Sequence, residues 1–334
     1  MIALSPLPAV VADVPALIAA LKACGASCLI TLAPGDWRNV NLDHVGAHAT
    51  IVGPKAVIHD LSLNYVWGLT FSGLEFSTAG ATPGGYGAMN DNWFKVIHST
   101  NITFDGLNVH GDPKGTLATT SSAFLIRYSE NVTVRNSEFS YLHHAIGYMT
   151  DTHLLLQRNT FHNLYDDAMR GAEISWSKFD GNTCHSNHPD KTDTDHPDCI
   201  QMWTVGTKTS THDISITNNR YDRGTGNSTQ FVFFGNEIGL PYYNIEISGN
   251  SSYGSGWNGI YIITANNVKI FNNTLITSCK PENGQITISR ISTGAVDGLS
   301  ITDNVAGGIG ERAPNTHKTQ YNNREAGCMD HSPF

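Results

Sequence analysis

A short pattern recurs along the chain and limits its possible folds more than any other feature. It consists of alternating apolar residues, a polar pair that often contains Asn, and a further apolar residue, as in NITFDGLNV from Asn101 and NVTVRNSEF from Asn131. Alternation with a period of two is typical of β-strands, and repetition of one short unit is typical of solenoids. A chain of 334 residues can then form one domain, because a solenoid grows without the size limit of a globular core.

Alignment of the repeats places six asparagines in one column. The intervals between them are 23, 37, 31, 23 and 31 residues. The shortest interval is about one coil of a β-helix, and the longer intervals are coils with inserted loops. Asn side chains stacked on successive coils can hydrogen-bond to one another, so we assign this column a structural role. Its members are Asn159, Asn182, Asn219, Asn250, Asn273 and Asn304.

A second strand also aligns in each coil. Its members begin at Ser122, His144, Asp167, Asp198, Thr229, Asn258 and Gly284. Alternation predicts which residues of these strands point into the core. The inward pairs are Phe124/Ile126, Ile146/Tyr148, Met169/Gly171, Ile200/Met202, Phe231/Phe233, Ile260/Ile262 and Ile286/Ile288.

The two ends of the chain differ from the repeats. Residues 14–24 (VPALIAALKAC) have the spacing of an amphipathic helix, which would cover the apolar surface and unpaired strand edge at the end of a solenoid. We expect one all-β solenoid domain over residues 1–334. It comprises an N-terminal cap in 1–35, coils in 50–310, and a C-terminal tail or cover in 311–334.

Charge and cysteine content restrict the partners of the chain. The net charge of -9 is spread along the sequence, so a nucleic-acid partner is not expected. The sequence has no run of 18 apolar residues, so no membrane span is expected, and the first residues lack the basic region of a signal peptide. The six cysteines include no CxxC motif. Cys24 and Cys28 could pair across a turn, or the cysteines could be buried thiols.

The segment LIAALKACGASCLITLAPGDW and the Asn-rich coils resemble the pectate-lyase-like superfamily. The segment is similar to the start of many of its polysaccharide lyases and epimerases, and the resemblance identifies no subfamily. It implies a single-stranded, right-handed parallel β-helix. It also implies a protein that acts on, or binds, a polysaccharide or oligosaccharide, because the superfamily holds lyases, C5 epimerases, hydrolases and phage tailspikes. The expected location is extracellular, periplasmic or on a virion, and the expected state is a monomer or a homotrimer.

The outward residues of the second strand form a mixed polar and aromatic surface. One outward column contains Lys95, Leu125, Gly147, Arg170, Gln201, Val232, Tyr261 and Thr287. The next contains Ile97, Arg127, Met149, Ala172, Trp203, Phe234, Ile263 and Ser289. Neighbours in a column lie about 4.8 Å apart. We therefore expect His144, Asp167 and Asp198, which begin three successive strands, to lie beside one another.

This surface has the residues needed for chemistry on a uronate. Arg170, Arg127, Lys95 and Lys191 could neutralise a sugar carboxylate, with Gln201, Trp203 and Tyr261 as further substrate contacts. Removal of the proton α to that carboxylate then needs a base, for which His144 or His196 is the candidate, and an acid, for which Tyr165 is the candidate. This is the chemistry of polysaccharide lyases and of C5 epimerases. Because two adjacent carboxylates repel, Asp167 and Asp198 also predict a compensating Arg170, a shared proton or a Ca²⁺ ion.

Two other functions remain open on the same residues. A glycoside hydrolase would use Asp166, Asp167 and Asp198 as its acid and its base or nucleophile. A non-catalytic glycan-binding or tailspike module would need only the aromatic residues. The loop of residues 185–197 contains three His and three Asp and is either a metal-binding or substrate-covering loop, or a solvated polar loop. We rank lyase or epimerase first, hydrolase second and binding module third.

Overall fold

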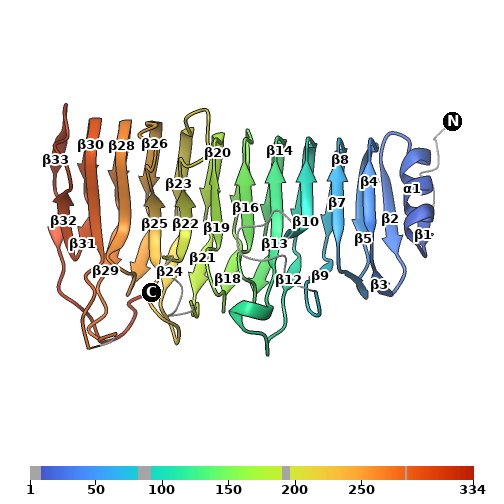
Figure 1. Ribbon diagram of the computed structural model, residues 1–334, viewed down its shortest axis with the longest axis horizontal. Helices are drawn as coiled ribbons and strands as arrows, with labels where there is room; N and C mark the ends of the chain where they lie inside the picture. Colours follow the sequence, from blue (N-terminus) through green and yellow to red (C-terminus); the bar gives the residue numbers. More distant parts are fainter. Residues whose placement is uncertain (1–8, 82–91, 190–195, 283) are drawn as a thin grey trace.

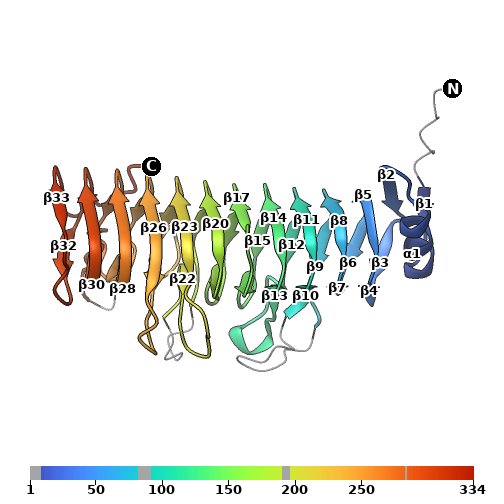
Figure 2. The same ribbon diagram turned by 90° about the horizontal axis from the view of Figure 1, so that it is seen from above.

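The chain folds into a right-handed parallel β-helix. The computed structural model describes residues 9–81, 92–189, 196–282 and 284–334. The coils form one straight stack, with the N-terminal helix at one end and the last strands at the other (Figure 1 and Figure 2). All the strand ladders between named strands are parallel, which confirms the predicted solenoid. Among the described residues, no helix is long and apolar enough to cross a membrane.

Each coil contributes strands to three columns. A 22-stranded sheet contains two of them, joined because β28 and β30 run through the bend between columns, and a 12-stranded sheet forms the third. The column that carries the candidate site is called the site column. It contains β4 (Val40–Asp43), β7 (Leu61–Asn64), β10 (Asn92–Ile97), β13 (Ser122–Arg127), β16 (Ile146–Met149), β19 (Met169–Ala172), β22 (Asp198–Met202), β25 (Gln230–Phe234), the start of β28 (Asn258–Phe271), the start of β30 (Arg290–Thr302) and β32 (Gly308–Glu311).

The other two columns complete the coil. The second contains β1 (Ala9–Val11), β2 (Cys28–Leu32), β5 (Gly46–Val52), β8 (Trp67–Ser72), β11 (Thr100–Asp105), β14 (Glu130–Arg135), β17 (Leu155–Gln157), β20 (Ser175–Asp180), β23 (His212–Thr217), β26 (Tyr242–Ser248), the later parts of β28 and β30, and β33 (Thr319–Tyr321). The third contains β3 (Gly35–Trp37), β6 (Ala56–Ile58), β9 (Glu75–Ser77), β12 (Asn108–His110), β15 (Glu138–Ser140), β18 (Thr160–His162), β21 (Thr183–His185), β24 (Arg220–Asp222), β27 (Ser251–Tyr253), β29 (Thr274–Ile276), β31 (Val305–Ala306) and β34 (Arg324–Glu325).

The predicted N-terminal helix is present as α1 (Val14–Ala23). The Asp13 side chain accepts a hydrogen bond of 2.8 Å from the Ala16 N–H, which satisfies one free donor of the first turn. Leu17 and Leu21 are fully buried against the first coils. The helix therefore covers the apolar end of the stack, as expected.

The predicted asparagine column forms a continuous ladder. Each side-chain amide donates to the Oδ1 of the Asn on the next coil at 2.9–3.1 Å, and the ladder extends one coil further, to Asn323. The residue before each ladder Asn has a positive φ, which Gly, Asn and Asp tolerate better than most residues. These preceding residues are Arg158, Gly181, Asn218, Gly249, Asn272, Asp303 and Asn322.

The core is a stack of apolar side chains inside the coils. Phe124 shows the density of this stack, because its ring centroid lies 4.8–6.1 Å from those of four other phenylalanines. Edge-to-face and offset arrangements of this kind stabilise aromatic cores beyond simple burial. The second strand column supplies the other side of the core through alternating residues such as Val132 and Val134, both buried.

The sequence prediction was wrong for two strands of the site column, and in the first of them, β25, the inward and outward residues were exchanged. In β25, Val232 pairs with Ile200 and with Ile260, so Val232 and Phe234 point inward and Phe233 points outward. The segment QFVFF is apolar on both faces, so alternation alone could not choose between them. As a result Gln230, not Thr229, begins this strand opposite Asp198.

The strand that follows in the site column is β30, not the segment from Gly284. Ile260 pairs with Ile291 and Tyr261 with Ser292, so Thr287 and Ser289 do not belong to the outward columns. Ile286, predicted to be in the core, is 46% exposed. The error arose because GQITISR has the clearer alternation, with Ile286 and Ile288, whereas the start of β30 (RISTGAV) has one large aliphatic residue, Ile291, before Val296. The coils also continue past residue 310, since β33 and β34 pair with β30 and β31.

All six cysteines form disulfides, so the alternative of buried thiols is wrong. The predicted pair Cys24–Cys28 is present, and Cys184–Cys199 and Cys279–Cys328 were not foreseen. Disulfides persist in oxidising compartments, which indicates a location outside the cytoplasm.

Candidate active site

The predicted cluster of charged residues lies on the outer face of the site column. Register pairs Gly147 with Arg170 and Arg170 with Gln201, as predicted. His144 and Asp167 lie two residues before β16 and β19, and Asp198 begins β22. The backbone N–H groups of Ala145 and Ala168, which follow His144 and Asp167, donate to Asp167 O and Asp198 O and so align the three residues on successive coils. We call the side chains of His143, His144, Asp166, Asp167, Arg170, His196, Asp198, Gln201 and Trp203 the charged cluster.

Asp198 is fully buried and holds His196 at the surface. Its Oδ2 lies 3.1 Å from Nδ1 of His196 and accepts a 2.9 Å hydrogen bond from Nε2 of Gln201. Its Oδ1 is buried without a hydrogen-bonding partner among the described residues. Burial raises the pKa of Asp198 to about 6, although the contacts with His196 and Gln201 oppose this shift. At neutral pH the carboxylate therefore fixes the imidazole, whose side chain is 49% exposed.

Asp167 is buried in the same way behind Arg170. Its Oδ1 accepts the backbone N–H of Asp198 at 2.6 Å, and its Oδ2 lies 3.3 Å from Nη1 of Arg170. Burial and the charge of Asp166 raise the pKa of Asp167 well above its usual value, while Arg170 lowers it. The Arg170 guanidinium lies over the Trp203 ring, 5.0 Å from the ring centroid, and the side chain is 25% exposed. The carboxylate and the indole together fix the direction of this cation.

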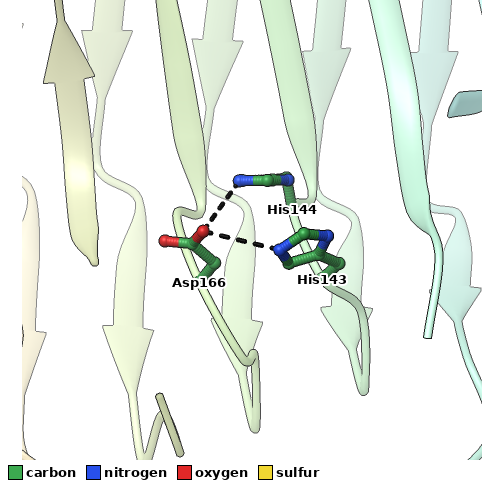
Figure 3. A group of neighbouring side chains, drawn as sticks. All are labelled: His143, His144 and Asp166. Carbon is green, nitrogen blue, oxygen red and sulfur yellow. Dashed lines mark ion pairs between the residues drawn. The ribbon is translucent and has the colours of Figure 1, made fainter. Parts of the chain in front are cut away.

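Two adjacent imidazoles face a third buried carboxylate (Figure 3). Oδ2 of Asp166 lies 3.0 Å from Nε2 of His144 and 3.5 Å from Nε2 of His143. Nδ1 of His144 is 3.0 Å from Oγ of Ser122, and Nη1 of Arg170 contacts its Nε2. Arg170 therefore bridges His144 and Asp167.

These contacts lower the pKa values of both the His144 imidazole and the Asp166 carboxyl group. Burial and the charge of Arg170 lower the pKa of His144 to about 4, so the ring is neutral at pH 7. Burial opposes ionisation of Asp166, but the two imidazoles outweigh it and its pKa lies below the usual value. His144 is therefore better suited to orienting Arg170 than to taking a proton at neutral pH.

The same three side chains have the ligand types of a transition-metal site. One ligand atom each of His143, His144 and Asp166 lies within 4.8 Å of the others, and imidazole with carboxylate suits such metals. However, the guanidinium of Arg170 contacts Nε2 of His144. A metal ion on that nitrogen would compete with, and be repelled by, this cation. The charge balance of the cluster thus favours Arg170 as its resident cation.

The charged cluster has a layered arrangement. Each carboxylate is almost fully buried and contacts a basic side chain: Asp166 contacts His144, Asp167 contacts Arg170, and Asp198 contacts His196. Of these basic groups, Arg170 and His196 reach the surface, whereas His144 is largely buried. The surface of the charged cluster therefore presents a guanidinium and an imidazole, with the carboxylates behind them.

A disulfide supports this arrangement. Cys184 lies on β21 and Cys199 follows Asp198 on β22, and the bond closes a sequence separation of 15 residues. The whole His-rich segment of residues 185–197 lies between these two cysteines in the sequence. The bond fixes the return of the loop to β22, next to the start of the strand that carries Asp198.

The remaining predicted site residues lie around or away from the charged cluster. The Tyr165 hydroxyl donates to the Gly115 carbonyl at 2.6 Å, and burial raises its pKa. Tyr261 stacks on Phe233 at 4.8 Å, and Phe233 follows Gln201 in the outward column. Arg127 contacts Met149 Sδ and lies over Tyr128, and Lys95 precedes Leu125 in the same outward column as Arg170. Lys191 lies outside the described residues.

Two members of the site were missed or undervalued from the sequence. His143 would be expected to point away from its neighbour His144, yet the strand begins only at Ile146, so alternation does not apply there. Phe233 was assigned to the core. Its ring packs against His196 at 4.6 Å and helps to position that imidazole.

Comparisons with known proteins bear on the fold. No protein-family model matches the sequence, and no curated protein is significantly similar to it. Among solved structures, an exopolygalacturonase from Thermotoga maritima matches with a TM-score of 0.54 and 10% identity over 96% of this chain and 93% of its own. An endo-xylogalacturonan hydrolase from Aspergillus tubingensis matches with a TM-score of 0.54 and 12% identity, and the match covers 97% of each chain. The surface adhesin PfbA of Streptococcus pneumoniae matches with a TM-score of 0.53 and 13% identity, and the match covers 94% of this chain and 87% of the adhesin. The chain thus has the right-handed parallel β-helix fold that carbohydrate-active enzymes and adhesins share.

Proposed function

We propose that this chain is a carbohydrate-active enzyme that removes the proton α to the carboxylate of a uronate unit, as a polysaccharide lyase does. The observation that carries the proposal is the pair of surface groups Arg170 and His196, each held by a buried carboxylate. A fixed cation can neutralise the sugar carboxylate, and a fixed imidazole can accept the proton. The structural neighbours that act on galacturonan polymers support a polysaccharide substrate.

The proposed reaction follows from the contacts of the two groups. The guanidinium of Arg170 pairs with the uronate carboxylate and stabilises the negative charge that develops when the C5–H bond breaks. His196 takes the proton through Nε2, because Nδ1 faces Asp198. The electron pair forms the C4–C5 double bond, and the C4–O bond breaks. The protonated imidazole can return its proton to the leaving oxygen; a C5 epimerase would instead return a proton to the other face of C5.

A glycoside hydrolase is the second candidate. Two structural neighbours are hydrolases of galacturonan polymers, and the three aspartates also favour it. In a hydrolase, however, two carboxyl groups must reach the glycosidic bond. Here Asp166, Asp167 and Asp198 are all at most 3% exposed. The burial of these aspartates therefore ranks hydrolysis below proton abstraction.

A Ca²⁺ ion was one of three ways expected to compensate Asp167 and Asp198, and the contacts of these carboxylates disfavour it. Within the described part of the chain, three of the four carboxylate oxygens of Asp167 and Asp198 face a donor or a cation, and Oδ1 of Asp198 does not. A calcium site needs 6–8 oxygen ligands. We expect activity to survive chelation with EGTA, because Arg170 supplies the positive charge. Loss of activity on chelation, with recovery when Ca²⁺ is added back, would contradict this.

The oligomeric state is a separate question, and light scattering in solution decides between a monomer and a homotrimer.

The test is a turnover assay on a panel of uronate polymers. Ultraviolet absorbance detects unsaturated uronate ends, and a reducing-sugar assay detects all chain breaks. The proposal predicts equal yields by both assays and loss of both in His196→Ala. Trp176→Ala, a change at an exposed residue of β20, serves as the control. Reducing ends without absorbance would move the function to hydrolysis. Binding without either signal would leave a glycan-binding module.

A further inference from the structure

A polar groove begins at His196 and runs along the site column toward the C-terminal coils. Its volume is about 470 Å³, which lies in the usual range for small-molecule sites. His196 belongs both to this groove and to the charged cluster, so the two are continuous. The groove is lined by His196, Pro197, Ser228, Thr229, Gln230, Gly256, Trp257, Asn258, Glu282, Gln285 and Thr287.

The polar groups of the groove are held in place by neighbours. Gln230 and Asn258 begin β25 and β28, one coil apart, and the Asn258 amide contacts Oε1 of Gln230. Oε2 of Glu282 accepts the Ser228 N–H at 3.0 Å and contacts the Ser228 hydroxyl. These contacts leave further hydrogen-bonding capacity on two amides and one carboxylate, which suits the hydroxyl groups of a sugar.

Trp257 adds an apolar surface to this groove. Its side chain is among the most exposed large apolar groups of the chain, at 52%. The Arg290 guanidinium lies over the ring, 5.7 Å from its centroid. An indole fixed by a cation and bordered by amides is an amphipathic platform, of the kind that packs against the C–H face of a pyranose.

The charge of the groove differs from that of the charged cluster. Its described lining contains no Lys or Arg and includes the carboxylate of Glu282. Oε2 of Glu282 lies 3.9 Å from Nη1 of the largely buried Arg223, which compensates its charge from behind, and the neighbouring Arg290 stacks on Trp257. The carboxylate therefore presents hydrogen-bond acceptors to the hydroxyl groups of an uncharged sugar, whereas the lining offers a uronate carboxylate no cation of its own. Building on the function proposed above, we infer that the groove binds an uncharged pyranose unit of the same polysaccharide whose uronate lies at Arg170. The substrate is then a heteropolysaccharide with uronate and neutral sugars close together.

The experiment measures polysaccharide binding by calorimetry in an Asp167→Asn background, which slows turnover and leaves the groove lining unchanged. The probes are four heteropolymers (xylogalacturonan, gellan, xanthan and hyaluronan) and two pure uronates (polygalacturonate and alginate). We expect at least one heteropolymer to bind roughly tenfold more tightly than either pure uronate. The additional substitution Trp257→Ala should remove this difference. The matched control Trp176→Ala, whose indole is 59% exposed on β20, should keep it.

The outcomes separate this inference from the proposed function. Equal affinity for heteropolymers and pure uronates, no binding to any probe, or an unchanged preference in Trp257→Ala each overturns the neutral-sugar groove. The turnover assay is scored separately on the unmodified protein. Turnover that needs His196 but not Trp257 leaves the function standing without the groove. A preference that needs Trp257 in a protein without turnover leaves the groove standing without the reaction.

Discussion

Replacement of Asn219 by leucine tests how much the asparagine ladder contributes to the fold. Its Oδ1 accepts the backbone N–H and the side-chain amide of Asn182, each at 2.9 Å. Its Nδ2 donates to Phe179 O at 2.9 Å and to Asn250 Oδ1 at 3.0 Å. Leucine has a similar shape and can make none of these bonds. At ~1 kcal/mol for each buried hydrogen bond, the four lost bonds amount to about 4 kcal/mol. This is a large part of the 5–15 kcal/mol typical of natural proteins.

The assay is urea unfolding followed by tryptophan fluorescence, with the disulfides kept intact. We expect Asn219→Leu to unfold at much lower urea than the parent. Asn41→Ala, at an exposed position of β4, is the control and should change stability by less than ~0.5 kcal/mol. A loss below ~1 kcal/mol in Asn219→Leu would refute the ladder as a main source of stability. Because a solenoid can unfold in parts, the midpoints are compared as well as the fitted free energies.

Three further predictions concern the charged cluster. Arg170→Lys should lower kcat/KM about 10²-fold, because an ammonium group cannot contact His144 and Asp167 while it stacks on Trp203. An unchanged kcat/KM would exclude a role for the guanidinium group. Activity should be present above pH 6 and fall as the pH drops through about 6, because protonation of the Asp198 carboxylate weakens its hydrogen bond with Nδ1 of His196. An activity profile that is flat from pH 5 to pH 7 would contradict this. The double change Cys184→Ser and Cys199→Ser should lower the free energy of unfolding by about 3 kcal/mol, because the bond closes a separation of 15 residues. It should also lower activity in the turnover assay, because the bond lies next to Asp198. Equal stability of the variant and the parent in urea unfolding would show that the bond is dispensable.

The repeat made most of the fold predictable. Each amide of the ladder donates a hydrogen bond to the amide on the next coil, so every coil must place one Asn at this position. The column could therefore be aligned from the sequence. The charged cluster followed from the same alignment, because Arg170 and Gln201 occupy equivalent positions in their coils.

The errors lie where this signal is weak. Alternation could not fix the register of β25, because Val232, Phe233 and Phe234 are all apolar. The pairs Cys184–Cys199 and Cys279–Cys328 depend on how loops return to the coils, which the repeat does not encode. The roles of Asp198 and His196 also needed coordinates, because only their burial shows which group is at the surface.

Nuclear magnetic resonance of a uronate polymer turned over in D₂O tests the central claim most directly. If His196 removes the proton at C5, the products contain either the olefinic signal of an unsaturated uronate or deuterium at C5, and His196→Ala yields neither. Products that keep their C5 protons and show only new reducing ends would contradict proton abstraction and assign the charged cluster to hydrolysis.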